Sequence, residues 1–226
     1  MLGTLLIGAV VFAGAPVDGV LVSPPVVEVN ADQPRADMTV TNPGDSPLEI
    51  LTGALFWSQD DEGRVTLSET AAVSIYPPHV QLAPREQRRL RLTVLERAPV
   101  RSAAYRIVLS IRDPATGEEV FALVPAFVVP NQAIESATVN VACSSQERCA
   151  VTLANTGSLP VRPARILLVL VSETGEVEQE LTAWWVLPGG TRSYPIALES
   201  ARVRREVRVR VELGDRNLTA SAVVAP

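Results

Sequence analysis

Apolar and polar residues alternate with a period of two along most of this chain. In residues 203–213, Val207 and Val209 fall on one side while Arg208 and Arg210 fall on the other. Such segments are short, rich in Val, Ile, Leu and Thr, and separated by Pro, Gly, Asn and Asp. Because successive side chains of a strand point to opposite faces, each segment buries one face and exposes the other. The pattern predicts an all-β protein, and no segment carries a convincing helical period.

Turn residues divide the alternating segments into two series of about seven strands each. The first series is predicted near residues 20–29, 35–42, 48–57, 72–82, 87–95, 103–112 and 119–129. The second series is predicted near residues 134–143, 148–154, 162–172, 177–186, 191–198, 202–213 and 216–224. Seven short antiparallel strands in about 100 residues is typical of an immunoglobulin-like sandwich. We therefore expect two immunoglobulin-like β-sandwich domains in tandem, at residues 14–130 and 131–226, joined at the proline-marked junction.

The longest apolar run lies at the N-terminus, from Leu2 to Ala15. At about 14 residues it is shorter than the roughly 20 residues that a helix needs to cross a bilayer. It is typical of a signal peptide, and a cut after Ala13 makes residues 1–13 the removed segment. No arginine occurs before Arg35, so a basic N-terminal region is missing. The alternative interpretation is an apolar strand of the mature fold.

Few residues in this chain can support catalysis or bind a metal. The 226 residues carry a net charge of −5, which gives no broad cationic surface for nucleic acid, and the 20 basic residues are all arginine. There are one histidine, His79, and two cysteines, too few for a Cys/His zinc site. No motif for a serine nucleophile, a phosphate loop, a zinc protease or a calcium loop is present. The acidic run at residues 60–62 lies in a predicted turn, where such residues are ordinary. We expect no enzyme activity, no cofactor and no metal site.

Cys143 and Cys149 lie between two predicted strands and are separated by five residues, SSQER. In an oxidising compartment they would close a small loop, so we expect a disulfide between them. The alternative is two buried free thiols. Neither cysteine has a histidine nearby in the sequence that would make it a nucleophile.

Residues 88–94 place Leu90 and Leu92 on one face of a predicted strand and Arg89 and Arg91 on the other. Together with Trp57, the leucines are expected in the core. An arginine row of this kind is usually a solvated face, and a binding patch is the alternative.

An ordered set of short motifs runs through both halves of the chain. In the first half the motifs are MTVTN at residues 38–42, Trp57, YPP at 76–78, LAP at 82–84 followed by Gln87 and Arg91, Tyr105-Arg106, and PAFVVP at 125–130. In the second half they are LANTG at residues 153–157 and WVLPG at 185–189. In order and spacing this set resembles the periplasmic pilus-assembly chaperones of the chaperone/usher pathway, particularly the archaic branch.

The resemblance implies a periplasmic chaperone that lends an edge strand to pilin-like subunits whose own fold lacks a strand, with an outer-membrane usher as a further partner. Such binding is β-augmentation, in which main-chain hydrogen bonds hold the partner and alternate side chains fill its groove. In this family the lending strand is the last strand of the first domain, which maps to Glu119–Val129. The row that we expect to enter the client groove is Val120, Ala122 and Val124. The bulkier row that we expect in the domain's own core is Phe121, Leu123 and Phe127.

Chaperones of this family usually anchor the subunit's terminal carboxylate with two basic residues. The corresponding places here fall near Val26 and Pro125, and neither residue is basic. The resemblance therefore leaves Arg89, Arg91 and Arg106 as the candidates for this role. The alternative hypothesis is a chaperone-like structural or adhesive protein of the cell envelope that has no pilin clients.

Overall fold

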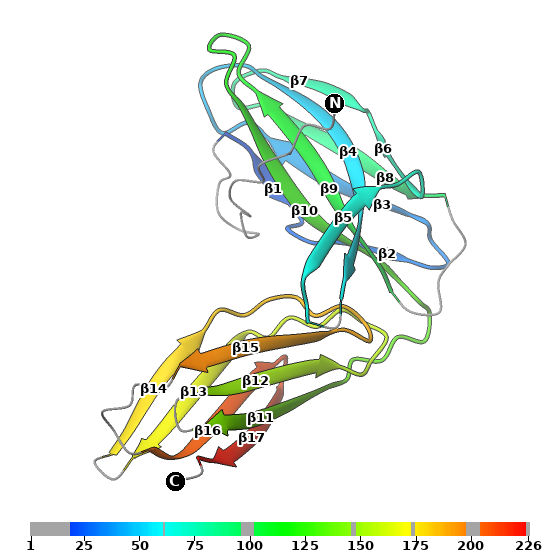
Figure 1. The fold of residues 1–226 in the computed structure, drawn as a ribbon. Coiled ribbons are helices and arrows are strands. Elements are labelled where there is room, and N and C mark those ends of the chain that lie inside the picture. The colour runs from blue at the N-terminus through cyan, green and yellow to red at the C-terminus, as the bar shows by residue number, and fades with distance from the viewer. Residues whose placement is uncertain are drawn as a thin grey trace, which may run out of the picture. The chain divides into compact units, whose positions relative to one another are not determined.

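The computed structural model describes residues 19–60, 62–95, 102–145, 148–172, 175–197 and 204–224, and these residues form strands and no helix (Figure 1). The chain divides into two compact units, of which the first comprises Met1–Trp57 with Leu67–Asn131 and the second Ser58–Thr66 with Gln132–Pro226. The predicted signal peptide, residues 1–13, lies outside the described residues. Within the described part of the chain, no helix is long and apolar enough to cross a membrane. The fold is all-β, with two immunoglobulin-like sandwiches in tandem.

Two sheets face each other across the core of the first unit. One sheet has the order β1 (Leu21–Ser23), β3 (Arg35–Thr41), β8 (Gln87–Val94), β6 (Val73–Tyr76). The other has the order β2 (Val27–Asn30), β10 (Glu119–Val129), β9 (Ala103–Arg112), β4 (Leu48–Gln59), β5 (Val65–Glu69), and β7 (His79–Leu82) also pairs with β4. The inner faces of both sheets are lined by aliphatic side chains, so the period-two pattern of the sequence becomes one continuous core.

Two segments predicted as single strands each change from one sheet to the other. The segment at residues 20–29 forms β1 in one sheet and β2 in the other, and the segment at residues 72–82 forms β6 and β7 in the same way. Both breaks fall at proline pairs, Pro24-Pro25 and Pro77-Pro78, which have no main-chain N–H for a ladder. The short strand β5 was not predicted from the sequence.

The burial pattern of β8 agrees with its predicted alternation. Leu90 and Trp57 are 0% and 2% exposed, whereas Arg89 and Arg91 lie on the solvent face. The predicted division of this strand into a buried row and a solvent-exposed row is confirmed.

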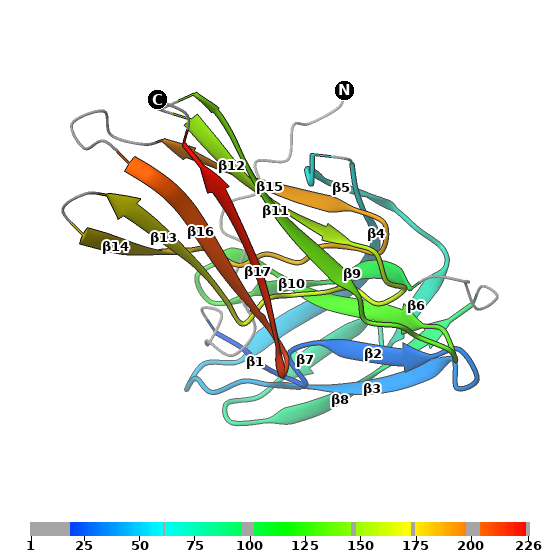
Figure 2. The same cartoon turned by 90° about the horizontal axis from the view of Figure 1, so that it is seen from below.

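The second unit is also built from two sheets, which Figure 2 shows from below. One sheet has the order β11 (Ala137–Ser145), β12 (Arg148–Asn155), β15 (Thr191–Ala197). The other has the order β14 (Gly175–Leu181), β13 (Arg165–Ser172), β16 (Arg204–Leu213), β17 (Arg216–Val223). The strand predicted at residues 177–186 is shorter than expected, since β14 ends at Leu181 and Val186 forms only an isolated bridge with Val161.

Each unit contains one buried asparagine that closes a turn in the same way. Asn42 and Asn155 are 0% and 2% exposed. The side-chain amide of each donates to the carbonyl oxygen four residues later, at 2.8 Å for Asn42 and 2.6 Å for Asn155. The side-chain oxygen of each accepts the N–H of the glycine two residues later, at 2.9 Å for Gly44 and 3.0 Å for Gly157. The Asn-x-Gly sequence of both motifs therefore supplies a satisfied polar group inside each sandwich.

Candidate functional site

The candidate site is the part of strand β10 that has a neighbour on one side only. β10 pairs with β9 in antiparallel fashion from Glu119 to Val128. On its other side it pairs with β2 in parallel fashion, but only from Ala126 to Val129. Among the described residues, the stretch 119–125 has no strand on the β2 side. A row of unpaired main-chain groups of this kind is a template for another strand.

The direction of the open main-chain groups follows from one hydrogen bond at the end of β2. The N–H of Ala31 donates to the carbonyl oxygen of Val129 at 3.0 Å, so the main-chain groups of Val129 face the β2 side. In a regular strand these groups alternate between the two sides, and the register of β10 with β9 is unbroken. Phe121 and Leu123 therefore direct their N–H and C=O groups to the open edge. Pro125 faces the same edge without an N–H, so it removes no donor from the ladder with β9.

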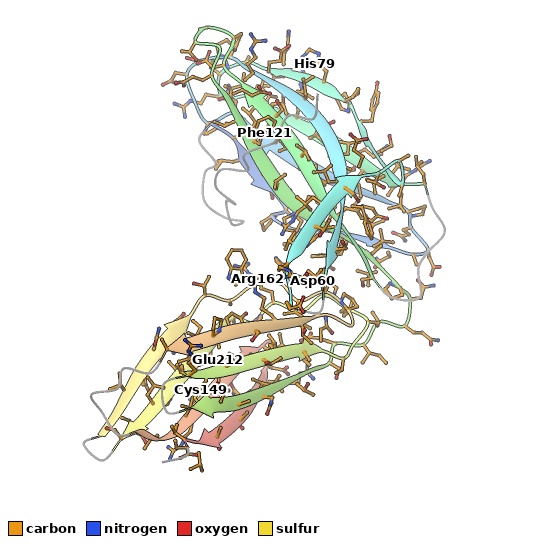
Figure 3. The ribbon with its side chains drawn as sticks, viewed as in Figure 1. Asp60, His79, Phe121, Cys149, Arg162 and Glu212 are labelled. Atoms are coloured by element: carbon orange, nitrogen blue, oxygen red, sulfur yellow. A yellow bond between two sulfur atoms is a disulfide. The ribbon has the colours of Figure 1, made fainter. Side chains whose placement is uncertain are left out.

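The side-chain rows of β10 are the reverse of the prediction. Val120, Ala122 and Val124 belong to the core of the first unit, and Ala122 and Val124 are 2% and 5% exposed. The expectation that this row points outward is wrong. The opposite row is the outward one, with Phe121, labelled in Figure 3, 51% exposed and Leu123 half-buried.

Phe127 shows that the outward row is not exposed along its whole length. It is 1% exposed and packs against Trp57, with ring centroids 5.8 Å apart. This contact lies in the half of β10 that β2 also covers. The expectation that Phe127 is buried is correct, but its ring packs against Trp57 and it is not part of the main core cluster of the unit.

The outer face around the open edge carries a second exposed apolar side chain beyond β10 itself. Phe121 lies opposite Ser110 of β9, and Ser110 lies opposite Leu51 of β4. Leu51 is 54% exposed. At the start of β10 the row ends on Glu119, whose carboxylate accepts a hydrogen bond from Ser110. The face therefore presents two exposed apolar side chains, Phe121 and Leu51, with the polar Ser110 between them and the charged Glu119 at the start of the strand.

Arg89 and Arg91 do not lie near this edge. Both are on β8, which belongs to the other sheet of the first unit. Arg91 donates to Asp37 at 2.9 Å, and Arg89 is 3.7 Å from the same carboxylate. The hydrogen bond from Arg91, with the charges of both guanidinium groups, holds the pKa of the Asp37 carboxyl below its usual value. The structure therefore separates these two arginines from the predicted strand.

Arg106 is the predicted arginine that does lie beside β10. It sits on β9 directly opposite Pro125, and its guanidinium carbon is 3.7 Å from the ring centroid of Trp57. Burial lowers the pKa of Arg106 to about 10, so it is charged at neutral pH. No ion pair to Arg106 is formed within the described part of the chain, and Nε1 of Trp57 is buried with no hydrogen-bond partner there. The half-buried guanidinium of Arg106 and the unpaired Nε1–H of Trp57 therefore lie close together on the outer face of this sheet.

The cysteines form the predicted disulfide. Cys143 and Cys149 lie directly opposite each other on β11 and β12, with an S–S distance of 2.03 Å. Cys149 is labelled in Figure 3. The bond closes a short connection in the second unit, and both thiols are consumed by it.

The remaining titratable candidates are in surface pairs. His79 lies 2.7 Å from the carboxylate of Glu49. In the acidic turn, Asp60 accepts hydrogen bonds from the main chain and side chain of Arg64, which lower the pKa of its carboxyl. Asp61 lies outside the described residues, and within them no cluster of 3 or more His, Cys, Asp or Glu residues could hold a metal ion.

The sequence matches no family model and no curated protein. Solved structures do match it over nearly its full length. A chain of the CsuC–CsuE chaperone–tip adhesion subunit pre-assembly complex, from the archaic chaperone-usher Csu pili of Acinetobacter baumannii, is 15% identical, with a TM-score of 0.66 over 89% of this chain and 97% of that one. The YadV chaperone is 12% identical, with a TM-score of 0.67 over 91% of this chain and 100% of its own.

A third similar structure is a chain of the Salmonella enterica SafA pilin in complex with the SafB chaperone. It is 13% identical, with a TM-score of 0.60 over 91% of this chain and 96% of that one. The structural neighbours of this protein are thus chaperones of pilus assembly, some of them solved together with a subunit. The chain has the two-domain immunoglobulin-like fold of the chaperone-usher pilus chaperones.

Proposed function

We propose that this protein is a divergent periplasmic chaperone of the chaperone/usher pathway, which binds pilus or surface-fibre subunits by lending them the open edge of β10. The observation that carries this proposal is the edge itself. Within the part of the chain that the structure describes, residues 119–125 have no strand on one side, and Phe121 and Leu123 project from the outer face of the same stretch. An exposed apolar edge strand is prone to aggregation unless a partner covers it. A subunit that lacks a strand is such a partner.

The proposed client contacts follow from the geometry of the edge. Main-chain groups of Phe121 and Leu123 pair with a strand of the client, while their side chains enter its apolar groove. This pair replaces the row of Val120, Ala122 and Val124, because those residues are in the core. Strand donation in this form requires no cofactor and no chemical step, so the protein acts as a binding chaperone.

Arg106 is the residue that we propose to bind the terminal carboxylate of the client. It lies on β9 directly opposite Pro125, and the family resemblance places a basic residue near Pro125. Its positive charge is half-buried and has no carboxylate partner among the described residues. Arg89 and Arg91 are less suitable since Asp37 already neutralises them. The proposal also includes export through the signal peptide at residues 1–13 and delivery of the client to an outer-membrane usher.

The proposal is tested by purification from the periplasm with identification of the bound protein by mass spectrometry. We expect the wild-type chain to carry a pilin-like subunit and Phe121→Asp to lose it. Tyr76→Asp is the control, because Tyr76 is also an exposed aromatic residue, at 73% compared with 51% for Phe121, and lies on the other sheet. If Phe121→Asp retains the subunit as well as Tyr76→Asp does, strand donation is wrong. A wild-type chain that carries no subunit supports a structural or adhesive role.

A further inference from the structure

The parallel ladder between β2 and β10 stops at a defined rung. The last pair toward the open edge joins Val27 to Ala126. Continuing the same register would pair Val26 with Pro125 and then Pro25, the next residue that faces β10, with Val124. Instead the chain leaves the sheet, and the preceding strand β1 (Leu21–Ser23) pairs with β3 in the other sheet. The open stretch of β10 thus begins where this next rung is missing.

The hydrogen bonds of the missing rung can be written from the register. In a parallel pair, a residue of one strand bonds the two residues that flank its partner. The bond from the N–H of Ala31 to Val129, whose partner is Asn30, shows which residues of β2 face β10. The next rung therefore needs the N–H of Pro25 to donate to the carbonyl oxygen of Leu123. It also needs the N–H of Pro125 to donate to the carbonyl oxygen of Pro25.

Neither donor exists, because both residues are proline. Pro125 lies in β10 and Pro25 lies in the bend between β1 and β2, and each removes one of the two hydrogen bonds of the same rung. Pro125 costs no hydrogen bond in the ladder between β10 and β9, because its nitrogen faces the open side of β10. The rung is thus removed from both strands, while the pairing on either side of β10 is otherwise preserved.

We propose that Pro25 and Pro125 together hold residues 119–124 of β10 open for a client strand by preventing β2 from extending along the edge. This proposal rests on the proposed function for the identity of the occupant, a β-strand of the client subunit. The prolines keep the carbonyl oxygen of Leu123 available to that strand. They also fix the end of the client's pairing, because the client meets β2 at Pro125.

The test is the double variant Pro25→Ala/Pro125→Ala, which supplies both missing donors. Its matched control is Pro47→Ala/Pro114→Ala, which removes two prolines from loops of the same unit. Hydrogen exchange of the new amides at positions 25 and 125 reports whether the rung forms, and this measurement needs no client. The affinity of the double variant for the subunit that co-purifies with the wild-type chain reports whether β2 now extends along the edge of β10 and closes it.

We expect both new amides to exchange at least tenfold more slowly than unprotected amides, and client affinity to fall about tenfold relative to the control variant, as two modest hydrogen bonds must be broken first. If the double variant does not fold, each single variant restores one donor and should lower affinity about threefold. Unprotected amides, or unchanged client affinity, overturn the role of the prolines. Retention of the client by Phe121→Asp instead overturns strand donation, and the exchange measurement still decides whether the prolines block the rung.

Discussion

Replacement of Val124 by aspartate should unfold the first unit, whereas the same change at Phe121 should leave it folded. Val124 is 5% exposed in the core and lies opposite Ile107, which is 0% exposed. Loss of a buried valine costs roughly 1.5 to 3 kcal/mol. A carboxylate placed among aliphatic side chains with no partner adds several kcal/mol, or is protonated at a comparable cost. The sum is a large part of the roughly 5 to 15 kcal/mol that stabilises a typical domain.

Phe121 offers the matched comparison, because it is on the same strand and 51% exposed. Its aspartate variant loses only partial burial and some strand propensity, about 1 kcal/mol in all. Urea unfolding followed by circular dichroism and by tryptophan fluorescence measures both variants. We expect a midpoint close to wild type for Phe121→Asp, and no cooperative transition from the first unit for Val124→Asp. A wild-type midpoint for Val124→Asp with a collapsed one for Phe121→Asp would show that the two rows of β10 are assigned the wrong way round.

Three further predictions concern stability. Asn42→Ala should destabilise the first unit by about 1 to 3 kcal/mol in a urea titration, since main-chain groups that the side chain satisfies become buried and unpaired. Reduction of the bond between Cys143 and Cys149 should lower stability by about 2 kcal/mol, and the unreduced protein should show no alkylatable thiol by mass spectrometry. Arg106→Met should leave the first unit as stable as wild type or more stable at pH 7, because burial lowers the pKa of the guanidinium to about 10 and thus opposes its charge. Any advantage of this variant should shrink as pH rises through about 10, where the folded wild type loses the unfavourable charge, and a constant difference across that range would contradict the argument.

The fold class and the division into two sandwiches are local properties of the sequence. Alternation of Leu90 and Leu92 with Arg89 and Arg91 assigns the faces of β8 without knowledge of its neighbours, because one row is charged. The disulfide has the same origin, since Cys143 and Cys149 flank one tight connection between strands that pair with each other. Wherever the two faces of a short segment differ in polarity, the sequence alone predicts which face is buried.

Only the tertiary structure decided the faces of β10. Both of its rows are apolar, so alternation cannot distinguish the core row of Ala122 and Val124 from the outward row of Phe121 and Leu123. The size of the side chains was misleading, because the small residues fill the inner layer of this sheet. The position of Arg106 beside Pro125 likewise depends on the register of β9 with β10.

The open edge also depends on partners distant in the sequence. In the sequence, Pro25 and Pro125 are two unrelated prolines. Only the parallel register of β2 with β10 shows that both would belong to the same missing rung. The sequence by itself predicted two β-sandwiches and their disulfide, and its resemblance to the chaperone family indicated the strand that we propose as the site. Pairing between distant segments decided which half of that strand is open and which side chains it presents, because register and sheet order are set by long-range packing and are not encoded in the periodicity of any one segment.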